Sequence, residues 1–159
     1  MLFFDDPEPA VFCHMESTDL YAGDADSHAK VVLKPKKGPI VEVNISNCCA
    51  YPQQSWLVMG TQGSMVLQDG EARWKYFDPE QIEPIVLDEG AAPGRKYSRE
   101  ELPWREQSDT VVTDGKENVR QFYRSLYSSI REGSALLVTP ESVRRVMVVL
   151  EKCREMSPI

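Results

Sequence analysis

The hydrophobic positions change period along the chain, from strand-like alternation in its first half to helix-like spacing near its end. In the segment 40–47, Val41, Val43 and Ile45 alternate with polar residues, which is the period of a half-buried strand. Similar short runs predict further strands at 11–17, 29–33, 56–60, 64–67 and 73–77. Toward the C-terminus the apolar residues recur every three or four positions, which indicates amphipathic helices.

Turn residues separate the predicted strands. Lys36-Lys37-Gly38-Pro39 links the second strand to the third, and Thr61-Gln62-Gly63 predicts a tight turn between the fourth and fifth. Asp69-Gly70 is the strongest hairpin signal in the chain. Residues 78–110 carry four prolines, and within them only Ile85–Leu87 has a strand-like pattern. We therefore expect a long irregular segment there, of the kind tied to function or to oligomer contacts.

Two C-terminal helices have well-defined ends. Asp114 and Glu117 have the spacing of a capping box, and Gly133 suits the left-handed position that ends a helix. Thr139 is a good N-cap, and Pro140 fits the first helical position of the second helix. Each helix has an apolar stripe that needs a partner surface, formed by Val119, Phe122, Tyr123, Leu126 and Ile130 in the first and by Val143, Val146, Met147, Leu150 and Cys153 in the second.

Strands followed by two helices predict an α+β fold. We expect an open, mostly antiparallel or mixed sheet of about six strands, with the two C-terminal helices packed on one face. A chain of 159 residues with 42% hydrophobic content can bury a sizeable core, so residues 1–159 are predicted to form a single domain. The other face of the sheet is then exposed to solvent, covered by another domain, or paired with a second copy.

Charge and cysteine content exclude several classes of function. A net charge of −7 argues against nucleic acid or an anionic membrane as partner. No apolar run is long enough to span a membrane, and the acidic start MLFFDDPEP does not fit a secretory signal. The four cysteines lack the spacing of a zinc site and suit a reducing compartment, so we expect a cytoplasmic protein.

The remaining candidate motifs do not assemble a catalytic site. Cys13 and His14 are adjacent in a predicted strand, so their side chains point to opposite faces and cannot act as nucleophile and base. The acidic segment 19–26 lacks the twelfth-position glutamate of a calcium loop. Gly60–Gly63 lacks the other residues of a dinucleotide or phosphate loop and fits a hairpin turn better. No catalytic, cofactor-binding or metal-binding residue is predicted.

Aromatic residues offer the one candidate binding surface. Trp56, Trp74, Tyr76 and Trp104 could stack on a sugar ring or fill a core and an interface, and Trp74 and Tyr76 share one strand face. The candidates for a substrate pocket are Tyr51, Gln53, Trp74, Tyr76 and Trp104.

Three blocks resemble the C-terminal domain of the glucose–fructose oxidoreductase, inositol dehydrogenase and rhizopine-catabolism (Gfo/Idh/MocA) family. The block LVMGTQGSMVLQDGEARWKYF (57–77) resembles its G-T-x-G hairpin. The block FYRSLYSSIREGSALLVTPESVRRVMVVLEKCREMS (122–157) is similar to its final two helices. MLFFDDPEPAVFCHMES (1–17) resembles the link into the first strand of its sheet, and the apolar start suggests a chain cut from something longer.

The resemblance implies the C-terminal half of an NAD(P)-dependent sugar or polyol dehydrogenase, which lines the substrate pocket and mediates oligomerisation. The family's N-terminal Rossmann domain, its E-K-P lysine motif and its H-x-x-D pair have no counterpart here. His14 does not replace the missing histidine, because it falls after the linking segment. We therefore expect an isolated chain that is inactive, binds no NAD(P), and needs the missing nucleotide-binding domain.

The expected partners are that domain and a second copy of the chain, the latter contacting the uncovered face of the sheet. The alternative is a stand-alone ligand-binding or dimerisation module with the same α+β fold. An upstream, in-frame βαβ unit ending in H-x-x-D would favour the first interpretation, and a natural start at Met1 would favour the second.

Overall fold

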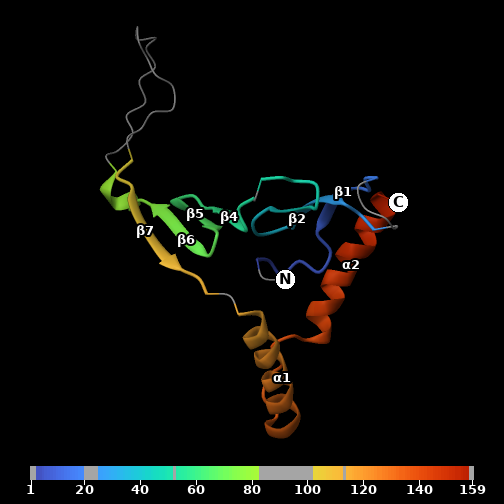
Figure 1. Ribbon diagram of the computed structural model, residues 1–159. Helices are drawn as coiled ribbons and strands as arrows, with labels where there is room; N and C mark the ends of the chain where they lie inside the picture. Colours follow the sequence, from blue (N-terminus) through green and yellow to red (C-terminus); the bar gives the residue numbers. More distant parts are fainter. Residues whose placement is uncertain (1–2, 20–24, 52, 83–101, 113, 158–159) are drawn as a thin grey trace. The chain divides into compact units, whose positions relative to one another are not determined.

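The chain forms two compact units, Met1–Tyr51 with Gly115–Ile159 (unit 1) and Pro52–Asp114 (unit 2). The structure is a computed structural model and describes residues 3–19, 25–51, 53–82, 102–112 and 114–157 (Figure 1). Compact units can belong to one folding domain, so the single-domain organisation of residues 1–159 stays a prediction.

Unit 1 consists of a three-stranded antiparallel sheet and two helices. The strands β1 (Ala10–Glu16), β2 (His28–Lys34) and β3 (Val41–Ser46) lie in sequence order. They are followed, after the residues of unit 2, by α1 (Gly115–Glu132) and α2 (Pro140–Met156). All five elements were predicted from the sequence to within a few residues.

The core of unit 1 lies between α2 and the sheet. Phe4, Cys13, Leu33, Val149 and Cys153 form one buried cluster. Strand register explains the composition of this cluster, because side chains opposite one another share a face, and residues two apart along a strand do too. The face that carries Cys13 and Leu33 therefore also carries the predicted apolar set of β3, Val41, Val43 and Ile45. Only Val41 packs against the cluster, whereas Val43 and Ile45 stay exposed.

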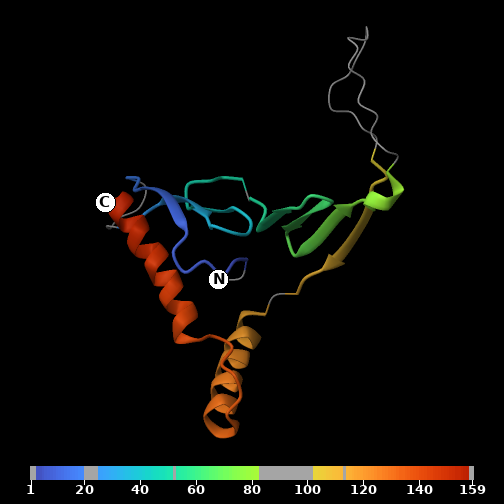
Figure 2. The same ribbon diagram turned by 180° about the vertical axis from the view of Figure 1, so that it is seen from behind.

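Hydrogen bonds fasten α2 to the first strand. The Met15 N–H donates to Ser157 Oγ at 2.9 Å, and Ser157 Oγ donates to the Met15 carbonyl at 3.1 Å. One turn earlier, Lys152 Nζ donates to the Pro9 carbonyl at 3.3 Å. Figures 1 and 2 show α2 lying along β1 in both views. These bonds satisfy backbone groups that the sheet edge at β1 would otherwise leave open.

The face by which α2 contacts the sheet differs from the predicted stripe. Val149 and Cys153 are buried, and Arg145 on the same side pairs with Asp5. The larger predicted stripe stays about half exposed at Val143, Val146, Met147 and Leu150. The helix carries apolar residues on two sides, and the smaller Val149 and Cys153 side chains are the ones against the sheet. Of the predicted residues, only Cys153 is buried.

The helix α1 contributes nothing to this core. None of its residues is buried, and its predicted stripe is exposed at Val119, Phe122, Tyr123 and Ile130. Its C-terminal end nevertheless forms as the sequence indicates, because Gly133 adopts φ +71° directly after the last turn. The Gly133 N–H donates to the Ser129 carbonyl at 3.2 Å. The local C-cap thus ends α1, although none of its residues reaches the buried core.

Unit 2 is a four-stranded antiparallel sheet in sequence order. Its strands are β4 (Trp56–Met59), β5 (Gly63–Gln68), β6 (Glu71–Tyr76) and β7 (Arg105–Thr110), and the short 3-10 helix η1 (Pro79–Gln81) follows β6. The β5–β6 hairpin turns at Asp69 and Gly70, whose φ values of 51° and 79° match the predicted tight turn.

The strand β7 was missed by the sequence analysis, which expected an irregular segment there. Its sequence REQSDT has no apolar residue, and all six residues are exposed. A strand that buries nothing lacks alternation, so only its pairing with β6 reveals it. At the other edge of the same sheet, β4 is WLVM and is equally exposed. One edge of this sheet is therefore polar throughout and the other apolar throughout.

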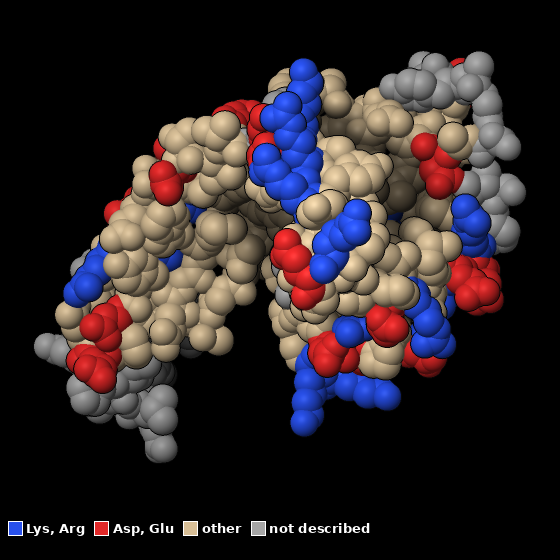
Figure 3. Space-filling view, turned by 90° about the horizontal axis from the view of Figure 1, so that it is seen from below, with Lys and Arg blue, Asp and Glu red and all other residues tan. Residues whose placement is uncertain are grey.

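The α+β class, the antiparallel strands and the two C-terminal helices are confirmed. Within the described residues the strands number seven and form two hydrogen-bonded sheets instead of one, and the helix that covers a sheet is α2. The predicted strand at Ile85–Leu87 lies outside the described residues. Among the helices that the structure describes, neither is long and apolar enough to cross a membrane. Figure 3 shows charged side chains of both signs set among broad uncharged areas.

Candidate functional site

The candidate site lies on one face of the unit 2 sheet. Along β6, Ala72, Trp74 and Tyr76 point to one side, because alternate residues of a strand share a face. Ala72 is buried, and the two aromatic residues are half-buried. Lys75 points to the opposite side, where its ammonium lies 3.7 Å from a Glu106 carboxylate oxygen. The sheet therefore has an aromatic face and a charged face.

A glutamine from β7 joins the two aromatic side chains. Gln107 lies opposite Trp74 in the strand register. The indole Nε1–H of Trp74 donates to Gln107 Oε1 at 3.2 Å, and Gln107 Nε2 approaches Tyr76 Oη at 3.5 Å. Because both contacts use the same amide, they fix which end of the amide faces each ring.

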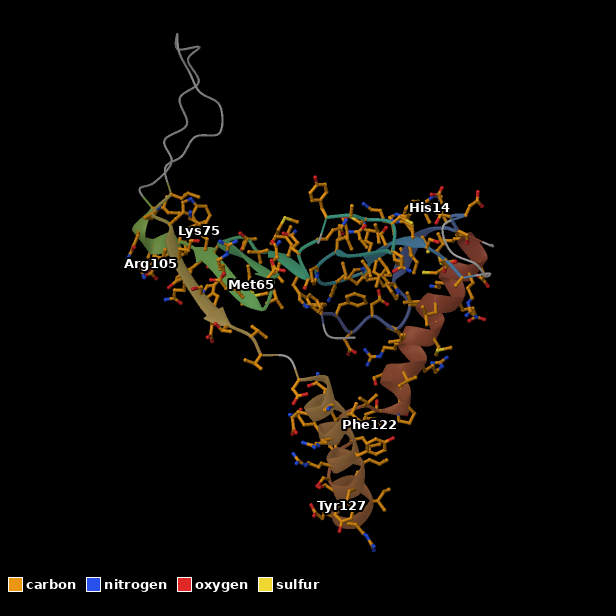
Figure 4. All side chains as sticks on the ribbon, viewed as in Figure 1. His14, Met65, Lys75, Arg105, Phe122 and Tyr127 are labelled. Carbon is orange, nitrogen blue, oxygen red and sulfur yellow. The ribbon has the colours of Figure 1, made fainter. Side chains whose placement is uncertain are left out.

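Arg105 extends this group beyond Tyr76. It lies opposite Tyr76 in the register, and its Nη2 donates to Gln81 Oε1 at 3.0 Å. Figure 4 labels Arg105 on β7, Lys75 on β6 and Met65 on β5. We call Trp74, Tyr76, Arg105 and Gln107 the β6–β7 patch.

Gly63 gives the Tyr76 end of the patch its shape. It lies opposite Tyr76 on β5. A Cβ atom there would lie 2.4 Å from the Lys75 carbonyl oxygen and 2.8 Å from Tyr76 Cβ. Any side chain would therefore push β6 away, so the close approach of the two strands requires glycine at this position.

The β6–β7 patch has the chemistry of a binding surface for a polar molecule with an apolar face. Indole and phenol rings stack on the C–H face of a ring or chain, and the amide and guanidinium can bond hydroxyl groups. It has no residue suited to acid–base or nucleophilic work at neutral pH. Within the part of the chain that the structure describes, no group of His, Cys, Asp or Glu could hold a metal ion.

The structure brings two of the five predicted pocket residues together, Trp74 and Tyr76. Trp104 packs edge-on against Phe77, with ring centroids 5.3 Å apart. Gln53 belongs to unit 2 and is exposed, and Tyr51 belongs to unit 1 and is 84% exposed. That any of these residues touches a substrate stays a prediction.

Sequence reasoning missed Gln107, Arg105 and Gln81. Each is a polar residue in a segment that was expected to be irregular. The only available signal was that segment's lack of glycine and proline between residues 105 and 110, which permits a strand but does not indicate one.

Cys13 and His14 lie on opposite faces of β1, as their adjacency predicts. Cys13 is buried against α2. His14 is exposed, labelled in Figure 4, and its Nε2 lies 3.1 Å from a Glu16 carboxylate oxygen. The two side chains therefore form no nucleophile–base pair. The acidic segment 19–26 lies largely outside the described residues.

Unit 1 contains an open apolar groove of about 610 Å³ at the junction of its helices. It is bounded by α1, by the link between the helices and by the start of α2. The Leu137 N–H donates to Ser125 Oγ at 3.0 Å and holds the link against α1. The lining residues include Phe122, Leu126, Leu136, Val138, Val143 and Met147.

The fold as a whole has solved counterparts. An NAD-binding protein from Listeria innocua matches with a TM-score of 0.66 at 14% sequence identity, over 97% of this chain and 44% of that one. An oxidoreductase from Bacillus cereus matches with a TM-score of 0.64 at 15% identity, over 91% of this chain and 43% of that one. Neither a family model nor a curated protein matches the sequence.

The chain spans about two fifths of the length of the solved structures that it matches. At such low identity the likeness shows the fold alone. Almost the whole of the present chain has the fold of one portion of those oxidoreductase and NAD-binding chains.

Proposed function

We propose that this chain is the substrate-binding and assembly half of an NAD(P)-dependent oxidoreductase of the Gfo/Idh/MocA type, acting on a sugar or polyol. One observation carries the proposal. Solved oxidoreductase and NAD-binding chains match 91–97% of this chain, yet the match covers only 40–44% of theirs. The resemblance of the hairpin and the two final helices to that family supports it independently.

The cofactor belongs to the other half of such an enzyme. A dinucleotide pyrophosphate is held where free N–H groups at a helix N-terminus meet an anion. Both helices here carry an acidic residue in the first turn, Glu117 in α1 and Glu141 in α2, and Thr139 already caps α2. Glu117 and Glu141 disfavour an anion at these two helix N-termini, which supports placing NAD(P) on the other half of the enzyme.

The β6–β7 patch is the proposed substrate surface. Trp74 and Tyr76 supply apolar ring faces, and Gln107 and Arg105 supply hydrogen-bond donors at the rim. In this role the patch positions the substrate and excludes water from one side, and it transfers neither hydride nor proton.

Two exposed apolar surfaces support the proposed partners. The groove and stripes of α1 and α2 suit the missing nucleotide-binding half, because a large apolar area on a free chain marks an interaction site. The face of the unit 2 sheet opposite the β6–β7 patch, with Leu57 and Met59 exposed at 49% and 80%, suits a second copy of the chain. Light scattering on the protein eluting at high concentration gives its mass and so tests whether a second copy binds. A monomeric mass would refute this part of the proposal.

Ligand-observed NMR against a panel of sugars and polyols tests the substrate role. We expect saturation transfer to at least one ligand, and a loss of roughly tenfold in affinity for Trp74→Ala and Gln107→Ala. Arg73→Ala is the matched control, because Arg73 points to the opposite face of β6 and should leave binding unchanged. An equal loss in all three variants would refute the patch as the site.

A fluorescence titration with NADH tests the assignment of the cofactor to the other half. We expect no saturable binding by the chain alone. Stoichiometric NADH binding would overturn the proposal that this chain is only the substrate half.

A further inference from the structure

Two buried cysteines face each other across the contact between α2 and β1. Cys13 lies in the middle of β1 and is 6% exposed, and Cys153 lies in the last turns of α2 and is 4% exposed. Both belong to the buried cluster of unit 1, and both are free thiols. They are far apart in the sequence, so only the folded state brings them together.

The two thiols lie in the same buried cluster, where α2 contacts β1. Burial raises the pKa of the Cys153 thiol to about 11, and the neighbouring Cys13 side chain adds to this increase. Nearby hydrogen bonds fasten α2 to the start of the chain. Ser157 bonds to the Met15 backbone, two residues from Cys13, and Lys152 bonds to the Pro9 carbonyl.

The other two cysteines have a different setting. Cys48 and Cys49 are adjacent, exposed and directly accessible to reagents. Cys48 contacts Thr18 Oγ1 at 3.6 Å, and the Cys49 thiol donates to the Tyr51 carbonyl at 3.0 Å. Their exposure makes them the sites of competing reactions, so the test below replaces them.

We propose that Cys13 and Cys153 are a redox-active pair that a small disulfide such as oxidised glutathione converts into a disulfide bond. The Cys13 thiolate attacks one glutathione sulfur, forms a mixed disulfide and releases the first reduced glutathione. The Cys153 thiolate then attacks the Cys13 sulfur of that mixed disulfide and releases the second. Two protein thiols are oxidised, one glutathione disulfide is reduced to two thiols, and the protons lost by the protein thiols pass to the released glutathione.

Burial makes the exchange depend on local opening of α2. The thiolate is the attacking species, and both thiols are screened from solvent, so reaction occurs when the final turns of α2 lift from β1. Once formed, the bond fastens the C-terminal helix to the first strand. It closes a loop that contains most of the chain, which is the arrangement in which a crosslink restricts the unfolded state most.

Peptide mapping of the intact chain tests the proposal. The protein carrying Cys48→Ser and Cys49→Ser is incubated with oxidised glutathione, and thiols that remain free are alkylated in urea before digestion. We expect one crosslinked species that joins the peptides of Cys13 and Cys153 and that dithiothreitol reverses. Tm should rise by roughly 10 °C on oxidation and return on reduction.

Matched variants separate the crosslink from other effects of oxidation. In the same background, Cys13→Ala and Cys153→Ala should each abolish the crosslinked species and the rise in Tm. The wild-type chain needs no substitution to give the peptide map, so a variant that fails to fold does not prevent the test. Two separate glutathione adducts on Cys13 and Cys153, or alkylation of both after oxidation, would overturn the proposal.

Discussion

The two C-terminal helices have similar lengths and sequence patterns, but only α2 packs against the sheet. α1 has 18 residues and α2 has 17, and each has an acidic residue in its first turn and a basic residue in its last. Each also has an apolar stripe. Yet α2 buries Val149 and Cys153 against the sheet, whereas α1 buries nothing. An amphipathic pattern thus shows that a helix has a face to cover, and it does not say what covers it.

Polar anchors account for the difference. α2 has Ser157, Lys152 and Arg145, which bond to Met15, Pro9 and Asp5 from the start of the chain. α1 has local bonds within the helix, such as that between Arg124 Nη1 and Glu117 Oε1 at 2.9 Å. The following substitutions test whether α2 is held by tertiary contacts and α1 by local ones.

The largest effect is expected for Val149→Ala in α2. The substitution removes two buried methyl groups from the core, so the free energy of unfolding should fall by about 2 kcal/mol. Val119→Ala in α1 is the same change at a residue that is 56% exposed, and it should alter the free energy by no more than about 0.5 kcal/mol. Urea denaturation measures both, and equal losses would show that α1 is also packed.

Ser157→Ala should be next in size. It removes both hydrogen bonds to the Met15 backbone and leaves a partly buried N–H and C=O unpaired, at a cost of about 1.5 kcal/mol. Ser125→Ala in α1 removes one exposed bond to the Leu137 N–H and should cost about 0.5 kcal/mol. Thermal unfolding of the two variants measures the contrast, and the reverse ranking would contradict the anchoring role of Ser157.

Gly133→Ala should cost about 1 kcal/mol through the local structure of α1. The backbone there has φ +71°, and no atom lies within 4 Å of an added Cβ, so the cost is purely conformational. Gly115→Ala at the start of the same helix has equally open surroundings and no positive φ, so it should be neutral or slightly stabilising. Circular dichroism during urea titration reports both, and a harmless Gly133→Ala would contradict the assigned helix end.

The smallest effect is expected for Asp6→Asn in unit 1, and it depends on pH. Backbone N–H groups of Lys36 and Glu8 bond to the Asp6 carboxylate and lower its pKa below the usual value, and the Lys152 ammonium of α2 contributes a little. A lowered pKa in the folded state means stabilisation that is present at neutral pH and lost as pH falls through that pKa. Asp6→Asn should therefore be less stable than the wild type at neutral pH, and the gap should close in acid. Urea unfolding at a series of pH values checks this, and a gap that does not change with pH would exclude the carboxylate charge as its cause.

Local signals in the sequence predicted the elements with specific chemistry. Thr139 and Pro140 begin α2, and Thr139 Oγ1 accepts from the Ser142 N–H at 3.2 Å. Asp69-Gly70 forms its hairpin, and Gly133 ends α1. Each of these depends on residues within a few positions of one another, so a single sequence contains the information.

Features that depend on distant partners could not be predicted in the same way. The side of α2 that faces the sheet follows from which side chains fit against Cys13 and Leu33, and an apolar residue on either side satisfies the periodicity equally well. The candidate site shows the same limit. Trp74 and Tyr76 were expected to share a face, but Gln107 joins them only through pairing with a polar strand that has no periodic signal.

The unequal edges of the unit 2 sheet have a consequence for growth by strand addition. A strand without charge or proline, such as β4, is open to pairing with another chain, and a polar strand with charged side chains, such as β7, resists it. Two molecules joined at β4 would present only β7 at both outer ends. Strand addition at this sheet therefore favours a closed pair over a fibre.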